Sequence, residues 1–275
     1  MGSLFAAAKA VLRFRDYQPQ RVTFTSARAW LKQFKGQDQK IVATLLDHII
    51  YFSESDTRDI LVAQNDALLR RLVRAGVASK NVIYMQVHDA GSSSPVMLSM
   101  LKIAGRLERF GCKFMDSRDS LGLNKLTNEL AEGAIIYVDD FSGSGDQFCQ
   151  ARDFAFQNVI GNFSEFLLVP CACEEALQQI AKRGIEIVTG YIHSKAERPL
   201  HEHSPLLSDE NRLTICTLCS QINKKAPLGY RELATMAVSF RGAPTSIPSI
   251  FRGSTNQTPF KGIFPRPIDL PKKRI

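Results

Sequence analysis

Two adjacent carboxylates, Asp139 and Asp140, end an apolar run and are followed at once by small residues, in the sequence AIIYVDDFSGSGDQF of residues 134–148. Glycines let a backbone approach a ligand closely, serines add hydroxyl donors, and a helix beginning near Asp146 would present its partial positive end. This combination predicts a loop that holds a phosphate. Its candidate residues are Ser142, Gly143, Ser144, Gly145, Asp146 and Gln147.

The two acids offer a chemistry that the loop lacks. Carboxylate oxygens accept hydrogen bonds from sugar hydroxyls, and they hold Mg²⁺ directly or through its waters. We therefore expect Asp139 and Asp140 to be the catalytic pair and the magnesium ligands, with a ribose on the acids and its 5′-phosphate on the loop. Paired acids at a strand end can also simply cap the next turn, and that alternative stays open.

A second loop rich in donors follows the first predicted strand, in the sequence HDAGSSSPVML of residues 88–98. Ser94 is a suitable N-cap and Pro95 suits the first helical position, so a helix should start there. In a parallel sheet this loop would lie at the same edge as the acids, where it would hold a diphosphate. The alternative is a polar turn with a cap. The candidate ligand-binding residues are Gly91, Ser92, Ser93 and Ser94.

The elements that must position these loops alternate between strands and helices. Short β-branched runs separated by amphipathic stretches with Gly or Pro at their ends are typical of an α/β fold with a parallel sheet flanked by helices. The predicted strands are NVIYMQV (81–87), CKFM (112–115), AIIYVDD (134–140), EFLLVPC (165–171) and IEIVTGYI (185–192). The predicted helices lie near residues 96–110, 123–131, 147–158 and 174–183.

The pattern divides the chain into three sections. Residues 1–80 are predicted to be a helical N-terminal section, because apolar residues recur at helical spacing from residue 26 to about residue 75. Residues 81–192 would form the α/β core. Residues 193–275 would form an irregular C-terminal cap, with one helix near residues 208–224 and a tail rich in Pro, Ser and Gly from residue 242 onward.

Composition limits the partner and the compartment. With 44% hydrophobic residues, 275 residues can bury a sizeable core. Lys and Arg exceed Asp and Glu by eight, but we give this excess little weight because we expect it to be spread along the chain. Six cysteines without a secretory leader favour reduced thiols, and no apolar run is long enough for a membrane helix. We expect a soluble, cytoplasmic protein with no membrane partner.

Two other patterns are better explained by packing than by chemistry. Cys216 and Cys219 have the spacing of half a zinc site, with His201 and His203 nearby. The surrounding sequence RLTICTLCSQI reads as a helix whose apolar face these cysteines share, so we expect no zinc. Trp30 is expected to pack within the helical section rather than to stack on a base.

The sequence IIYVDDFSGSGDQ, residues 135–147, resembles the ribose-phosphate loop of type I phosphoribosyltransferases. In that family four apolar residues precede two acids, two apolar residues, two Thr or Ser, Gly, any residue and Thr. On this match Asp139 and Asp140 take the ribose-binding acids, and Ser144 and Gly145 take the central phosphate-binding pair. The resemblance implies the type I phosphoribosyltransferase fold.

The chain departs from this family pattern at three positions. Gly143 stands where the family usually has a hydroxyl, Gln147 replaces the closing Thr, and Asp146 adds a carboxylate beside the expected phosphate. Ordinary members also carry a flexible cover loop before this strand. Here the sequence DSRDSLGLNKLTNEL of residues 116–130 reads as a turn and a helix.

The resemblance extends to a divergent branch, the phosphoribosyltransferase-like proteins of bacterial conflict and antiphage systems, which have a similar DDFSGSG-like loop. It covers roughly residues 40–267, with APTSIPSIF and GIFPRP in the tail as supporting features. It implies a glycosyltransferase or nucleotide-cleaving relative that uses phosphoribosyl diphosphate or a nucleotide with Mg²⁺. It also implies a role in antiviral defence, with a protein or nucleic-acid partner from the same system.

Two other functions compete for the same residues. DDFSGSGD is similar to the first motif of S-adenosylmethionine-dependent DNA methyltransferases, although the chain has no Asn-Pro-Pro-Tyr or Asp-Pro-Pro-Tyr tetrad. A non-catalytic module that binds ribose phosphate and regulates a partner would explain the unusual Asp146 and Gln147. Both alternatives stay open at the level of sequence.

Overall fold

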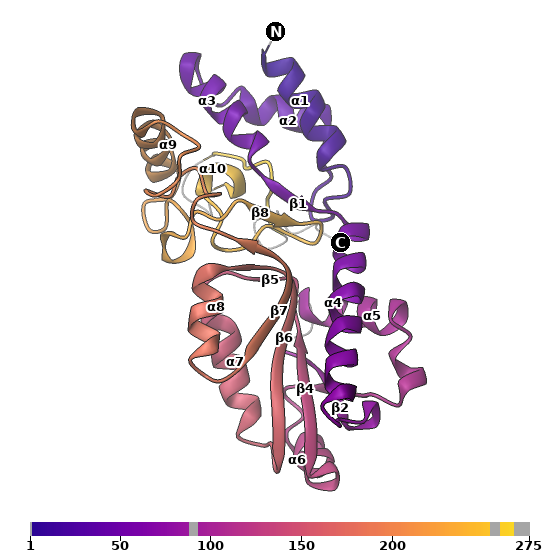
Figure 1. The fold of residues 1–275 in the computed structure, drawn as a ribbon. Coiled ribbons are helices and arrows are strands. Elements are labelled where there is room, and N and C mark those ends of the chain that lie inside the picture. Colours follow the sequence, from indigo (N-terminus) through magenta and orange to yellow (C-terminus); the bar gives the residue numbers. More distant parts are fainter. Residues whose placement is uncertain (1, 88–92, 254–258, 267–275) are drawn as a thin grey trace. The chain divides into compact units, whose positions relative to one another are not determined.

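The computed structural model describes residues 2–87, 93–253 and 259–266 (Figure 1). These residues form two compact units. One unit is Ser55–Ile192, which we call the sheet unit. The other combines Met1–Glu54 with His193–Ile275, and we call it the helical unit. The sequence had placed section boundaries after residues 80 and 192. The helix that follows Glu54 packs on the sheet, so the first 80 residues do not form one unit.

The sheet unit is built on a six-stranded sheet with the order β3-β2-β4-β6-β5, and β7 also pairs with β6. The pairs β2–β3, β2–β4, β4–β6 and β5–β6 are all parallel. This confirms the predicted parallel α/β fold. The strands are β2 (Val82–Gln86), β3 (Lys113–Asp116), β4 (Glu132–Val138), β5 (Phe141–Ser142), β6 (Asn162–Cys173) and β7 (Glu186–His193).

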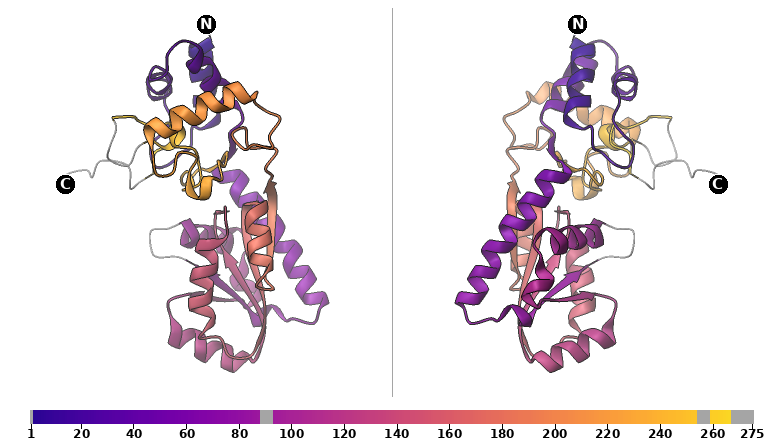
Figure 2. Two further views of the ribbon diagram at one scale, coloured as in Figure 1. Left: turned by 90° about the vertical axis from the view of Figure 1, so that its left-hand side faces the viewer. Right: turned by 90° about the vertical axis from the view of Figure 1, so that its right-hand side faces the viewer.

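Helices cover both faces of this sheet, as the two views of Figure 2 show. Residues 134–138 of β4 are therefore fully buried although they point alternately to the two faces, which explains their unbroken apolar sequence. One face carries α4 (Glu54–Arg74) and α5 (Ser93–Ala104). The other carries α6 (Ser120–Leu130), α7 (Asp146–Phe156) and α8 (Glu174–Ala181). Short 3₁₀ turns lie at η1 (Ser79–Asn81) and η2 (Leu107–Phe110).

One predicted helix is too long. The sequence predicts a helix over residues 96–110, whereas α5 ends at Ala104 and η2 follows as a separate turn. Arg106, between them, has a positive φ of 51°, which an α-helix does not contain. The other helices of this unit agree with the prediction to within about three residues.

The helical unit contains a small sheet that the sequence analysis missed. Its helices are α1 (Gly2–Arg13), α2 (Phe24–Leu31), α3 (Gly36–Asp47), α9 (Asp209–Ile222) and α10 (Ser249–Arg252), with a 3₁₀ turn η3 (Tyr230–Glu232). Between α3 and α4 lies β1 (Ile50–Phe52), which pairs in parallel with β8 (Ala237–Ser239). The predicted continuous helical section is therefore wrong at this point.

The described part of the C-terminal tail packs into this unit. Phe264 lies 4.9 Å from Phe14 in an edge-to-face contact between ring centroids, and both rings are fully buried. Trp30 stacks on Phe251, and its indole N–H donates to the Ile250 carbonyl oxygen at 2.8 Å. The prediction that Trp30 packs in the interior is confirmed. The tail thus completes the core of the N-terminal helices.

Two other predictions concern α9 and the membrane. Cys219 lies fully buried on α9, as the apolar face of a helix requires. Within the described ranges no three His, Cys, Asp or Glu side chains converge to hold a metal ion. None of the described helices is both long enough and apolar enough to cross a bilayer.

Candidate functional site

The two acids lie where β4 ends. The Asp139 amide still donates to the Leu168 carbonyl oxygen of β6 at 3.2 Å, and β5 then pairs with β6 in the register that β4 had. Asp140 therefore passes opposite Pro170, which has no N–H, and the ladder is interrupted there. Asp139 is 8% exposed, and Asp140 is partly exposed. The interruption leaves both carboxyl groups at the carboxyl edge of the sheet.

A single hydroxyl bridges the acids. Ser93 Oγ, at the start of α5, lies 2.9 Å from Asp139 Oδ1 and 2.7 Å from Asp140 Oδ1. The Asp140 amide also donates to Asp139 Oδ1 at 2.9 Å. A hydroxyl has one proton, so it can donate to only one carboxylate at a time. The acid pair and Ser93, which the sequence predicts to lie at the same edge of the sheet, are therefore close together.

The pKa of the second acid is raised. Burial raises the pKa of Asp140 to about 7, and the negative charge of Asp139 acts in the same direction, while the hydrogen bond from Ser93 opposes them. Within the part of the chain that the structure describes, no Lys, Arg or His side chain forms an ion pair with Asp140. The site therefore carries a carboxyl group whose negative charge a bound cation or hydrogen-bond donor would stabilise.

Ser94 has a different role from the one predicted. Its side chain is fully buried, and its hydroxyl accepts from the Val87 amide at 3.0 Å while donating to the Val138 carbonyl oxygen at 2.6 Å. The Ser94 hydroxyl thus accepts from the residue after β2 and donates to the last residue of β4. The hydroxyl therefore ties the two strands together, and it neither caps α5 nor has a proton left for a ligand.

The phosphate loop runs from β5 into α7, which begins at Asp146 as predicted. Gly145 is its N-cap residue with a φ of +82°, a conformation that favours glycine. A Cβ at this position would also lie 3.1 Å from Ile180 Cγ1 on α8. No described residue accepts a hydrogen bond from the amides of Gly143, Ser144 or Gly145. Gly143 and Ser144 are partly exposed and Gly145 is buried, so an anion would reach the first two amides at the N-terminal end of α7 most directly.

The side chains of the loop divide into three kinds. Ser142 is 6% exposed in β5, so its hydroxyl is not presented to solvent. Ser144 Oγ donates to Asp146 Oδ2 at 3.0 Å and accepts from the Asp146 amide at 3.2 Å. Gln147 is exposed. The backbone, rather than the predicted serine hydroxyls, is therefore the main source of donors here.

The remaining predicted ligand residues can be placed only in part. Gly91 and Ser92 lie outside the described residues. The structure adds a group that the sequence analysis missed at the end of β3, where Asp116 accepts hydrogen bonds from the Arg118 amide and Nε, both at 2.9 Å. This contact holds the pKa of Asp116 at about 2. The predicted strand stopped one residue short of Asp116, so this acid was not recognised at the edge.

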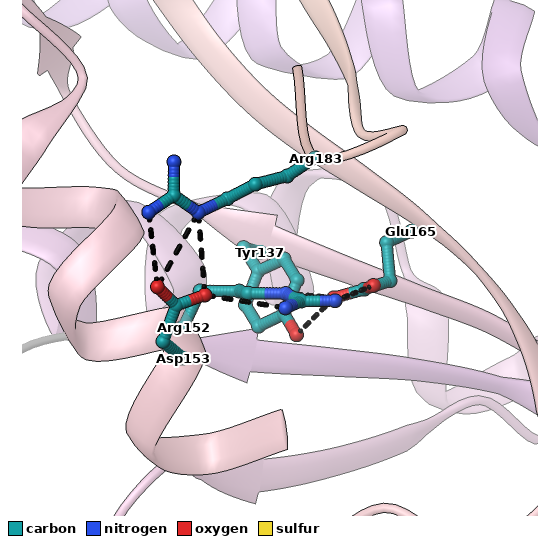
Figure 3. Close-up of polar contacts among 5 residues, drawn as sticks. All are labelled: Tyr137, Arg152, Asp153, Glu165 and Arg183. Carbon is teal, nitrogen blue, oxygen red and sulfur yellow. Dashed lines mark hydrogen bonds and ion pairs between the residues drawn. The ribbon is translucent and has the colours of Figure 1, made fainter. Parts of the chain in front are cut away.

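A second charged cluster in the sheet unit serves as a reference. Arg152 of α7 makes two hydrogen bonds to Glu165 of β6, one of them from Nε at 2.8 Å (Figure 3). Its guanidinium also lies over the Phe156 ring. The Tyr137 hydroxyl donates to the same carboxylate at 2.8 Å. Asp153 pairs with Arg152 and, at 3.0 Å, with Arg183. Each charge in this cluster has an opposite charge beside it.

Comparison with solved structures lists distant likenesses. A solved structure titled orotate phosphoribosyltransferase from Aeropyrum pernix has 16% sequence identity and a TM-score of 0.30, covering 46% of this chain and 70% of that chain. The AQ2163 protein from Aquifex aeolicus has 12% identity and a TM-score of 0.31, covering 42% of this chain and 56% of that chain. No curated protein sequence matches.

The family assignment comes from sequence. A family model described as PRTase-CE matches residues 27–266, which include the acid pair, the phosphate loop, and most of both units. The chain belongs to the PRTase-CE family.

Proposed function

We propose that this chain is a cytoplasmic phosphoribosyltransferase-like enzyme that binds phosphoribosyl diphosphate or a nucleotide at the carboxyl edge of the sheet unit. Asp139 and Asp140 would accept hydrogen bonds from the ribose hydroxyls. The amides of residues 143–145 would hold the 5′-phosphate. Ser93, at the start of α5, lies where a diphosphate would meet the positive end of that helix.

The observation that carries this proposal is the continuity of the site. Acids that accept from a sugar and amides that donate to a phosphate follow one another between β4 and α7, and Gly145 turns the chain so that the helix end faces the same edge. A ribose 5-phosphate carries both kinds of partner on one small molecule. A site for a phosphate alone would need the amides without the acids.

The chemistry that this arrangement supports is displacement at the anomeric carbon. The bond from that carbon to a diphosphate oxygen breaks, the electron pair leaves with the diphosphate, and a nucleophile forms the new bond. Positive charge develops on the sugar as the bond breaks, and nearby carboxylates stabilise it. Asp139 and Asp140 would supply that negative charge, so no covalent protein nucleophile would be required.

The acid pair also fits Mg²⁺. One or two carboxylates together with substrate phosphates are its usual ligands, and the raised pKa of Asp140 shows a carboxyl that an added cation would favour in its ionised form. When bound, the metal would neutralise the departing diphosphate. Asp139 and Asp140 are the residues that would hold it.

A binding role without catalysis is the second candidate. The observation in its favour is Asp146, whose carboxylate sits in the first turn of α7 with Ser144 donating to it. This negative charge beside the phosphate loop would weaken the hold on a multiply charged substrate. A module that senses a less charged nucleotide would tolerate it better.

Thermal unfolding with a panel of ligands tests these candidates. Phosphoribosyl diphosphate with Mg²⁺ should raise the melting temperature in proportion to the logarithm of its concentration, because only a ligand of the folded state stabilises it. Stabilisation by nucleotides without any turnover would favour the sensing module. Stabilisation by S-adenosylmethionine alone would contradict the proposal and support a methyltransferase.

We also propose that the chain acts in antiviral defence, a role that rests on the family resemblance alone. Bacteria carrying the chain with its neighbouring genes should then reduce phage plating, and the Asp139→Asn/Asp140→Asn variant should lose this protection. Equal plating on both strains would reject the link between the site and defence.

A further inference from the structure

Positive charge is concentrated at the N-terminal end of the chain. Residues 1–40 contain eight of the Lys and Arg residues but only two acids, Asp16 and Asp38. Most of the net charge of +8 therefore arises in these residues. Residues 17–37 contain no Asp or Glu at all, although they include four cations. The expectation that the excess is spread along the chain therefore needs correction.

These cations share a face of α2 with an exposed aromatic ring. Phe24, Arg28 and Lys32 are spaced four residues apart, which places them on one side of the helix. Phe24 is 43% exposed, and Arg28 and Lys32 are also exposed. Ala27, Trp30 and Leu31 form the buried side of α2 in the core of the helical unit. The exposed side thus carries two cations in line with an aromatic ring.

Three further exposed cations extend this face. Arg21 lies two residues before Thr23, the N-cap residue of α2, and Lys35 is the N-cap residue of α3. Lys261 is held beside the end of α2, because its amide donates to Gln33 Oε1 at 3.0 Å and its carbonyl oxygen accepts from Gln33 Nε2 at 2.8 Å. We call this surface the α2 strip. It comprises Arg21, Phe24, Arg28, Lys32, Lys35 and Lys261.

The cations of the α2 strip are not used within the protein. Among the described residues, no carboxylate forms an ion pair with any of the five. The neighbouring helix α1 behaves differently: Lys9 pairs with Asp47 at 2.8 Å, and Arg13 donates to backbone carbonyl oxygens of residues 46, 47 and 49. The unit thus pairs the cations that support its fold and leaves those of the strip to solvent.

The helix that presents the strip is firmly held. Thr23 and Ser26 form a reciprocal capping box at the start of α2. Trp30 anchors the buried side by its hydrogen bond to the Ile250 carbonyl oxygen and its stacking on Phe251. The exposed side chains therefore project from a fixed surface, so binding would require ordering only of the side chains themselves.

We propose that the α2 strip binds single-stranded nucleic acid, with its five cations on backbone phosphates and Phe24 stacked on a base. Unpaired cations around an exposed aromatic ring are the combination by which proteins hold single strands without reading sequence. An anionic membrane fits less well, because a membrane helix presents a broad apolar face and this face has one large apolar side chain. The proposal does not depend on the ligand of the sheet unit.

Fluorescence anisotropy with labelled deoxythymidine and uridine oligomers of about 20 nucleotides tests this proposal. The test variant is Arg28→Ala/Lys32→Ala/Lys35→Ala. The control is Arg74→Ala/Lys125→Ala/Lys182→Ala, which removes the same charge from exposed positions of the sheet unit. At low salt we expect the test variant to bind at least ~10-fold more weakly, and the control to change less than ~2-fold.

The salt dependence separates phosphate contacts from stacking. For single strands the slope of log K against log salt falls by about 0.7 for each lost contact, so the test variant should lose about 2 from the wild-type slope. Phe24→Ala should weaken binding by roughly 5-fold or more with the slope unchanged, and Phe24→Trp should restore it. Binding of either oligomer supports the proposal, and their ratio shows whether RNA or DNA is preferred.

Three outcomes would overturn the proposal. The first is no binding of either oligomer at low salt. The second is equal weakening in the test and control variants, which would indicate a nonspecific charge effect. The third is binding to phosphatidylserine vesicles, but not to oligomers, that is lost in the test variant, which would assign the strip to a membrane surface. Melting temperatures of all variants should stay near wild type, because the substituted side chains are exposed.

Discussion

The Arg152 cluster and the acid pair both set charged side chains against the same sheet, yet they differ in how completely those charges are compensated. Glu165 receives two hydrogen bonds from Arg152 and one from Tyr137, and its side chain is only 7% exposed. Asp140 shares one serine hydroxyl with a second carboxylate, and its pKa rises to about 7.

Under the proposed function, this difference separates a structural role for the Arg152 cluster from a ligand-binding role for the acid pair. A buried charge with complementary partners holds elements together, in this case α7 on β4 and β6. A partly buried carboxyl beside another carboxyl costs stability, and the proposed ligand would compensate this cost. Since the Arg152 cluster fixes α7, it also positions the phosphate loop at the start of that helix.

The largest effect is expected from breaking the compensated cluster. Glu165→Ala would remove two of the hydrogen bonds of the largely buried Arg152 guanidinium and the acceptor of the Tyr137 hydroxyl, and it should lower the free energy of unfolding by about 3 kcal/mol. The control is Glu186→Ala, which breaks the half-exposed Arg71–Glu186 pair and should cost less than about 1 kcal/mol. Urea denaturation measures both. Similar losses in the two variants would contradict the contrast drawn here.

Removing the uncompensated charge of Asp140 should instead raise the free energy of unfolding. Asp140→Asn, studied without metal or ligand, should raise the free energy of unfolding at pH 8 by about 1–2 kcal/mol, because the partly solvent-exposed carboxyl is screened. The folded protein holds a proton on Asp140 that the unfolded chain releases above its ordinary pKa of 3.8. Wild-type stability should therefore fall as the pH rises from about 4 to 7, and the gain in the variant should shrink as the pH is lowered. A gain independent of pH would reject this explanation.

The smallest expected effects on stability come from the adjacent residues Ser93 and Ser94, and these effects should differ. Ser94→Ala leaves the Val87 amide and the Val138 carbonyl oxygen without their partner and should cost about 1 kcal/mol, with ligand binding retained. Ser93→Ala should cost less than about 0.5 kcal/mol and should shift the pH dependence of stability upward, because the Ser93 hydrogen bond favours ionised Asp140. Chemical denaturation at several pH values measures both, and interchanged effects would reverse the roles assigned to these residues.

The core strands could be predicted because each carries its own signal. The runs around residues 82–86 and 132–138 are rich in β-branched and aromatic residues, and they end at polar or glycine-rich segments. The start of α7 was equally predictable, because Gly145 precedes a polar first turn. Local sequence therefore determined where the two loops of the site begin.

Contacts between segments that lie far apart in the sequence could not be predicted from local sequence. β1 and β8 are three residues each and lie far apart in sequence, so neither shows a measurable alternation. The burial of α4 against the sheet depends on contacts such as the Tyr84 hydroxyl donating to Asn65 at 2.6 Å, which no spacing rule contains. Ser94 looked like an N-cap from its neighbours, and only the juxtaposition of β2 and β4 showed that the strands use its hydroxyl.

Calorimetric titration of phosphoribosyl diphosphate with Mg²⁺ into wild type and into Asp139→Asn/Asp140→Asn tests the central claim most directly. Two charge-assisted hydrogen-bonding groups are lost in the variant, so we expect saturable binding by wild type and at least ~100-fold weaker binding by the variant, without a fall in melting temperature. An unchanged isotherm in the double variant would contradict the assignment of this acid pair to the ligand.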